Sequence, residues 1–120
     1  MKRTKIIQLN DKKIVLCDLK GIEREEILRV SQQTWSLIRT SLSEGEKANF
    51  LVDMTDVQIP PKMMEEIVSL AENFKQSIAK EGVIGLHGFR RTMLNIYGWS
   101  IGSKLKAFDD HEKAMVWLAS

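Results

Sequence analysis

The chain has 120 residues, a length typical of one domain; 43% are hydrophobic and 28% charged, as in folded globular proteins rather than disordered ones. Its net charge of +2 is too small to favour nucleic acid or an anionic membrane as a partner. With one cysteine no intrachain disulfide forms, and without a signal-peptide core or membrane span we expect one cytoplasmic domain over residues 1–120.

The first half of the chain predicts a β-hairpin, a long helix and a buried strand. Two β-rich runs, 5–9 and 13–19, are separated by Asn10–Lys12, which is a turn signal. Residues 23–42 place apolar side chains at steps of three and four, which predicts a helix with one buried face. The continuous apolar run 50–52 predicts a strand that is covered on both sides.

The middle of the second half predicts two more helices around a short strand. Prolines open the first of these helices, 60–78, because proline fits the first helical turn. Gly82 is predicted as its C-terminal cap. The apolar run 83–86 then predicts a strand, and the spacing of apolar residues predicts a further helix over 89–99.

The chain is predicted to end on a strand and a helix. The strand covers 104–108, and the helix begins at Asp109, with Glu112 three residues later in a capping-box-like pair. The full order is therefore β-β-α-β-α-β-α-β-α. Because alternating strands and helices build parallel sheets with right-handed crossovers, we predict an α/β fold with a mixed, mostly parallel five-stranded sheet and about four helices.

Short motifs spread over nearly the whole chain carry a family resemblance. They are Asp18 to Gly21 before an acidic helix start, Leu51-Val52-Asp53, Val83-Ile84-Gly85, and the closing Phe108-Asp109-x-x-Glu112-x-Ala114-x-x-Trp117-Leu118. With these motifs in this order of elements, the chain resembles the STAS/SEC14-type domains of the SpoIIAA-like family. The resemblance implies a STAS-like fold and a non-enzymatic regulatory or protein-interaction role.

The resemblance does not extend to the phosphorylation motif of the anti-sigma-factor antagonists in this family. Those proteins carry an Asp-Ser-Ser/Thr-Gly-type loop, and a kinase phosphorylates its Ser or Thr. The corresponding stretch here, Asp53–Pro61, has no Ser-Gly pair, and Thr55 is its only hydroxyl residue. The SEC14 side of the resemblance implies an alternative role, as a carrier or sensor of a small apolar or anionic ligand.

The candidate site follows from the predicted sheet. Ligands of open α/β sheets bind beyond the carboxyl ends of parallel strands, which here are residues 53–56 and 87–91. The amides that open helix 89–99 are candidates to hold an anion together with two arginines, or the same loop is only a tight turn with solvated arginines. The candidate ligand-binding residues are Asp53, Thr55, His87, Gly88, Arg90 and Arg91.

The remaining chemistry-bearing residues point away from catalysis. Asp53 either caps its own turn or pairs with an arginine across the loops, and an enzyme would require it to meet His87. Cys17 lies within a predicted strand, so we expect a buried, inert thiol, and we expect His111 to be solvated. We therefore predict no enzyme, no metal and no cofactor, but a protein partner, a second copy of the chain, or a small ligand.

Overall fold

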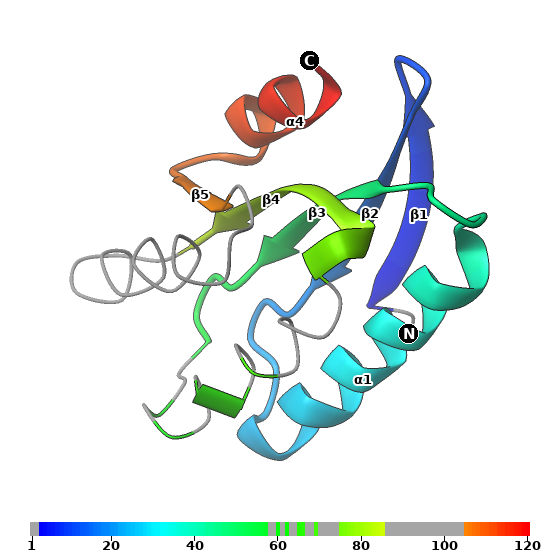
Figure 1. The fold of residues 1–120 in the computed structure, drawn as a ribbon. Helices are drawn as coiled ribbons and strands as arrows, with labels where there is room; N and C mark the ends of the chain where they lie inside the picture. The colour runs from blue at the N-terminus through cyan, green and yellow to red at the C-terminus, as the bar shows by residue number, and fades with distance from the viewer. Residues whose placement is uncertain are drawn as a thin grey trace.

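The computed structural model describes residues 3–57, 75–85 and 105–120, together with the single positions 60, 62, 65, 66 and 69. Its elements are β1 (Thr4–Leu9), β2 (Lys12–Asp18), α1 (Arg24–Ser41), β3 (Ala48–Asp53), the 3-10 helix η1 (Lys75–Ser77), β4 (Ile78–Ile84), β5 (Leu105–Phe108) and α4 (His111–Ala119). The five strands form one sheet in the order β1-β2-β3-β4-β5 (Figure 1). The predicted α/β class and the five-stranded sheet are therefore confirmed.

The sheet is mixed, with one antiparallel pair at the edge. β1 and β2 form the predicted hairpin, joined by Asn10 and Asp11, which have φ of 52° and 64°. Positive φ at both central residues is the signature of a tight hairpin turn, and Asn and Asp tolerate it better than other residues with a side chain. The pairs β2–β3, β3–β4 and β4–β5 are all parallel, so the sheet is mostly parallel, as predicted.

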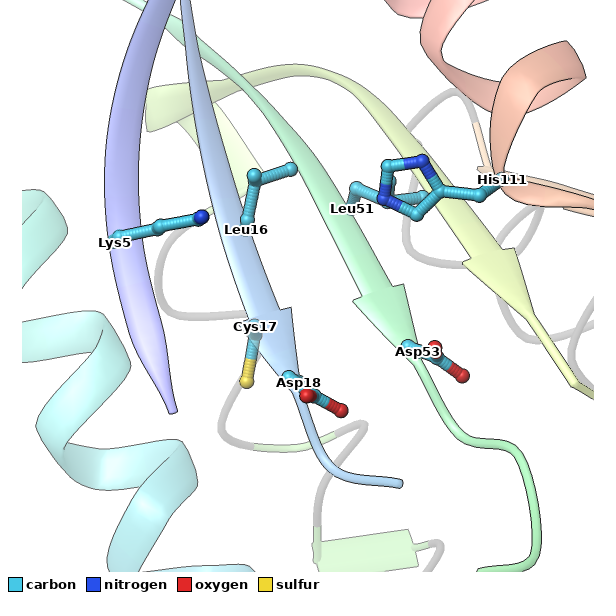
Figure 2. Close-up of a pocket in the computed structure, with 7 residues that line it drawn as sticks. All are labelled: Lys5, Leu16, Cys17, Asp18, Leu51, Asp53 and His111. Carbon is cyan, nitrogen blue, oxygen red and sulfur yellow. The ribbon is translucent and has the colours of Figure 1, made fainter. Parts of the chain in front are cut away.

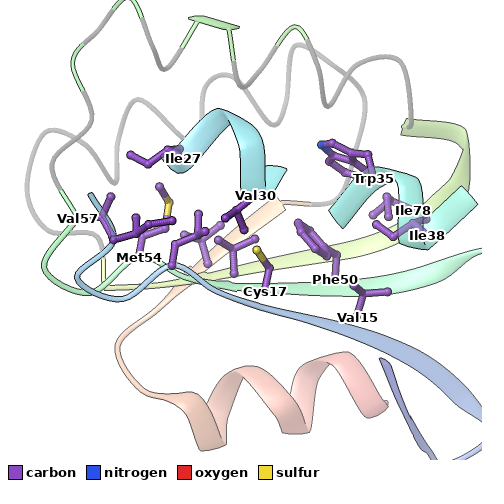
Figure 3. Close-up of a cluster of buried hydrophobic side chains, with 14 of the residues drawn as sticks. Val15, Cys17, Ile27, Val30, Trp35, Ile38, Phe50, Met54, Val57 and Ile78 are labelled. Carbon is purple, nitrogen blue, oxygen red and sulfur yellow. The ribbon is translucent and has the colours of Figure 1, made fainter. Parts of the chain in front are cut away.

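Helix α1 covers one face of the sheet and α4 covers the other (Figure 1). The apolar stripe predicted for the first helix is buried as expected, and the ring of Trp35 lies 5.3 Å from that of Phe50 in β3. Figure 3 shows the resulting cluster between α1 and the sheet. The smaller cluster under α4 contains Ile14, Leu51, Ile84, Ala114 and Leu118.

Strand β4 begins five residues earlier than the strand predicted at 83–86, and this corrects two predictions. Ile78 continues the spacing of three and four that precedes it, so its pattern fits a helix as well as the first position of a strand. Gly82 is not a helix cap but lies inside β4. A Cβ at Gly82 would be 3.3 Å from the side chain of Leu51 and 3.5 Å from that of Phe108. The glycine therefore lets these side chains of the two neighbouring strands pack closely against the main chain of β4.

The last helix starts one residue later than predicted. Its N-cap is Asp110, whose carboxylate accepts a hydrogen bond from the amide of Lys113 at 2.8 Å, so the predicted pair of Asp109 and Glu112 is wrong by one position. An aspartate side chain at the N-cap satisfies an amide that the helix itself leaves unpaired.

The predicted count of about four helices and their strict alternation with strands do not match the described residues. The α-helices whose bounds are described are α1 and α4, and with the short η1 the described elements follow the order β-β-α-β-η-β-β-α. The helix predicted over 89–99 lies outside the described residues, and so does most of 60–78, where the described positions 62, 65, 66 and 69 are helical. Within the described ranges, no helix combines the length and the apolar character needed to cross a membrane.

Candidate functional site

The carboxyl ends of the four parallel strands meet at one edge of the sheet. The register aligns Asp18 of β2 with Asp53 of β3, Asp53 with Ile84 of β4, and Ile84 with Phe108 of β5. Ligands of open α/β sheets bind at this edge, beyond the strand ends. The two aspartates therefore stand next to each other, at the place where the sequence predicts a site.

Asp53 holds the turn that follows β3. Its Oδ1 accepts hydrogen bonds from the amide of Thr55 at 3.0 Å and from the Thr55 hydroxyl at 2.6 Å. Aspartate favours such bonds to backbone two residues ahead. Of the two roles predicted for Asp53, the local cap is confirmed, while its alternative partners, Arg90 and Arg91, lie outside the described residues.

Asp18 makes the same kind of turn at the end of the neighbouring strand. Its Oδ1 accepts from the amide of Lys20 at 2.9 Å. The guanidinium of Arg3 donates to the backbone oxygens of Asp18 and Lys20, at 3.1 and 3.3 Å, and so fixes the path of this loop. Asp18 was not among the predicted site residues, because the second strand was predicted to run to Leu19, whereas β2 ends at Asp18.

Backbone hydrogen bonds join these loops to each other and to β4. The amides of Leu19 and Gly21 donate to the carbonyls of Asp53 and Thr55, at 2.9 and 3.1 Å. Gly85, with φ of 89°, comes so close to the second turn that a Cβ there would lie 2.4 Å from the amide nitrogen of Thr55. This edge of the sheet is therefore a set of loops held in place by their main chain.

A pocket of about 310 Å³ opens on the α4 face of this edge (Figure 2). Two of its residues, Lys5 and His111, are exposed side chains that the sequence analysis did not place in a site. Lys5 enters because the hairpin pairs it with Leu16, and His111 enters as the first residue of α4. The lining residues are Lys5, Leu16, Cys17, Asp18, Leu51, Asp53 and His111.

The other predicted site residues cannot be placed against this pocket. His87, Gly88, Arg90 and Arg91 lie outside the described residues, so the anion-binding loop and the meeting of His87 with Asp53 remain predictions. Of the six candidate residues, the structure describes Asp53 and Thr55, and it brings these two together in one turn.

The described part of the site contains one thiol, and its surroundings disfavour the thiolate form. Cys17 is buried, its Sγ lies 3.5 Å from the hydroxyl oxygen of Thr34, and burial raises the pKa of its thiol. A thiol with a raised pKa is a poor nucleophile because little of it is thiolate. Across the described ranges, no three side chains of His, Cys, Asp or Glu are grouped as a metal site would require.

Comparison with known proteins identifies the fold. No protein-family model and no curated protein matches the chain. Among solved structures, the chain is similar to a protein from Shewanella loihica PV-4, described as an uncharacterized member of the DUF3478 family with a SpoIIAA-like fold. The two are 16% identical, the match covers 96% of this chain and 91% of that one, and the TM-score is 0.67. At this identity the likeness shows the fold alone, and it confirms the SpoIIAA-like resemblance predicted from the sequence.

Proposed function

Starting from its SpoIIAA-like fold, we propose that the chain is a cytoplasmic, non-enzymatic protein-interaction domain with a regulatory role. Its binding surface is the carboxyl-terminal edge of the sheet. The observation that carries the proposal is the pair of aspartate turns at the ends of β2 and β3, which presents Asp18 and Asp53 side by side on a fixed main chain.

A fixed surface of this kind suits recognition of another protein. Binding costs less conformational entropy when the contacting loops are already held in one shape. Here the main-chain bonds from Leu19 and Gly21 join the two loops before any partner arrives. The close approach of Gly85 to Thr55 leaves the second loop little room to rearrange.

The chemistry of the edge supports binding rather than catalysis. The hydroxyl of Thr55 already donates to the carboxylate in its own turn, at 2.6 Å. The nearest thiol, that of Cys17, is buried and has a raised pKa. Neither group is poised for attack on a substrate, because a carboxylate alone is too weak a base to deprotonate a hydroxyl, and a thiol with a raised pKa is mostly protonated.

The alternative role is that of a carrier or sensor of a small ligand, and one observation favours it. The pocket of about 310 Å³ falls at the lower end of the volumes usual for small-molecule sites. Leu16 and Leu51 in its lining favour a small apolar ligand, and the predicted anionic ligand depends on Arg90 and Arg91, which lie outside the described residues. Native mass spectrometry of the chain purified from its host would test this role, since a carrier would retain a bound mass.

The experiment that tests the protein-interaction role is affinity capture followed by mapping. The tagged chain is used to capture partners from its native host, and each captured protein is purified and recombined with the chain. Hydrogen exchange should then slow at amides 18–21 and 53–57, and remain unchanged on the exposed side of α1. Recovery of no specific partner, or protection confined to α1, would contradict the proposal, and self-association of the chain would identify a second copy as the partner.

A further inference from the structure

The pocket at the carboxyl-terminal edge is built in two rows. Leu16 and Leu51 are register partners on β2 and β3 and form an apolar row. Two residues further along the same strands, Asp18 and Asp53 are also register partners and form a carboxylate row. Because alternate residues of a strand share a face and rise about 3.3 Å each, the carboxylates stand roughly 7 Å beyond the leucines.

The carboxylate row carries two like charges, and no described cation forms an ion pair with either of them. Neighbouring strands lie about 4.8 Å apart, and like charges directly opposite each other are unfavourable. Each aspartate uses Oδ1 for its own turn, while no hydrogen bond among the described residues uses Oδ2 of either one. Within the same ranges, no ion pair reaches either carboxylate.

Among the described residues, the basic side chains around the pocket make no ion pair with either carboxylate. Arg3 contacts Asp18 through the backbone oxygen and not through the carboxylate. Lys5, the register partner of Leu16, lines the pocket from β1, and it makes no ion pair with a described carboxylate. The imidazole of His111, at the start of α4, lines the same pocket as Leu51 (Figure 2). The pocket therefore combines a non-polar floor with two carboxylates at its end that form no ion pair with a described residue.

We propose that this pocket receives one arginine side chain of the protein partner. This inference rests on the proposed interaction role and names the chemistry that the partner presents. The three methylenes of arginine lie on Leu16 and Leu51, and the guanidinium enters between Asp18 and Asp53. Its planar fork of donors reaches two acceptors on different strands at once, which the point charge of lysine does less well.

A small probe tests the pocket before any partner is identified. N-acetyl-arginine methylamide is titrated into the labelled chain, and amide shifts are followed by NMR. We expect shifts at Leu16, Asp18, Leu51 and Asp53. The matched probe is N-acetyl-citrulline methylamide, which has the same length but a neutral urea in place of the guanidinium, and it should leave these amides unchanged.

Substitutions that keep the turns separate the charge from the fold. An asparagine side chain also accepts an amide hydrogen bond two residues ahead, so Asp18→Asn and Asp53→Asn should preserve both loops. Each substitution should lower the affinity for the arginine probe about three-fold, and the double variant should lower it about ten-fold. The control Glu44→Gln removes one negative charge from an exposed position that follows the C-terminus of α1, away from the pocket. It should leave the affinity for the probe unchanged.

The outcomes distinguish this inference from the interaction role on which it rests. Equal shifts from arginine and citrulline, or full affinity in the double variant, would overturn the arginine pocket. So would inorganic phosphate shifting the same amides when the arginine probe does not. A captured partner that binds the double variant as tightly as the parent chain would remove the inference and leave the interaction role standing. A probe that binds as predicted while no partner exists would support the pocket and remove the role.

Discussion

The two faces of the sheet are buried to different extents. On the α1 side, an 18-residue helix covers a cluster of fifteen buried residues among those described. On the α4 side, a nine-residue helix covers a cluster of five, with Ile7 and Leu16 of the hairpin only partly buried. The pocket lies on this side, at the ends of β2 and β3, with the first residue of α4 in its lining.

This difference separates the source of stability from the place of binding. Buried apolar area is the main favourable term in folding, and most of it lies under α1. Helix α4 is held on the sheet partly by side-chain hydrogen bonds. Asn49 donates to the carbonyl of Leu118, and Lys80 donates to the carbonyl of Trp117. We therefore expect substitutions under α1 to weaken the fold most, and substitutions at the pocket to leave it intact.

The largest effect should come from a truncation under α1. Ile38 is fully buried, so Ile38→Ala should lower the free energy of unfolding by about 4 kcal/mol through lost apolar contact and a residual cavity. The matched change on the other face is Leu118→Ala, also at a fully buried position, and we expect about 3 kcal/mol because the short α4 can shift to fill the space. Urea unfolding followed by tryptophan fluorescence measures both. A larger loss for Leu118→Ala would reverse the comparison of the faces.

The next effect concerns the edge that both faces share. Gly85→Ala should cost about 3 kcal/mol, because its Cβ would collide with the main chain of Thr55 and because φ is 89°. Gly45→Ala is the control, since Gly45 has φ of 79° with no atom within 4 Å of the added Cβ, and it should cost about 1 kcal/mol. Thermal unfolding of both variants gives the difference. Equal losses would mean that the loop at Thr55 moves freely, against the fixed edge inferred above.

Most of the fold could be predicted because its elements follow regular patterns. The stripe of Ile27, Val30 and Ile38 has the period of a helix, and it is buried as expected. The start of β4 could not be recovered, because Lys80 and Glu81 interrupt the apolar run in the middle of the strand. Lys80 is tolerated there since its ammonium bonds the end of α4 and lies 5.3 Å from the centre of the Trp117 ring.

The site was predicted only in part, for a reason of geometry. The turn at Asp53 and Thr55 is local, so residue types alone indicate it. Lys5 and His111 reach the pocket through the hairpin register and through the position of α4, and neither of these can be read from neighbouring residues. Asp18 was missed because its strand was predicted one residue too long, to Leu19, which placed the aspartate inside the strand and not at its end.

A smaller effect tests how α4 is joined to its face. Asn49 is buried, and its side-chain amide donates to the carbonyl of Leu118, so Asn49→Ala should cost about 2 kcal/mol by leaving that carbonyl without this donor. Lys80→Met keeps the aliphatic stem and removes a half-buried ammonium, so we expect a loss below about 1 kcal/mol. Hydrogen exchange within α4 should accelerate more in the first variant. Similar exchange rates in both would contradict the role of Asn49.

The smallest effect depends on pH and lies on the α1 side of the sheet. Glu81 shares the face of Val83, and burial raises the pKa of its carboxyl from 4.5 to about 7, although the residue as a whole stays partly exposed. Between those values the unfolded chain releases the proton while the folded chain keeps it. Stability should therefore fall as pH rises from about 4.5 to 7, by about 1 kcal/mol once the partial exposure is allowed for, and level off above.

Glu81→Gln should remove this pH dependence, because glutamine stays neutral at every pH. Glu46 acts in the other direction: the Ser43 amide and the Lys13 ammonium lower the pKa of its carboxyl, so its contribution is lost only as pH falls below the ordinary value of 4.5. The parent chain and Glu81→Gln are compared by urea unfolding at pH 5 and pH 8. Both contain Glu46, so its contribution cancels in the difference and the contribution of Glu81 remains. The parent chain should lose stability relative to the variant at pH 8. An unchanged difference at the two pH values would mean that solvent reaches the Glu81 carboxyl, and that the α1 face is less completely closed than its core cluster indicates.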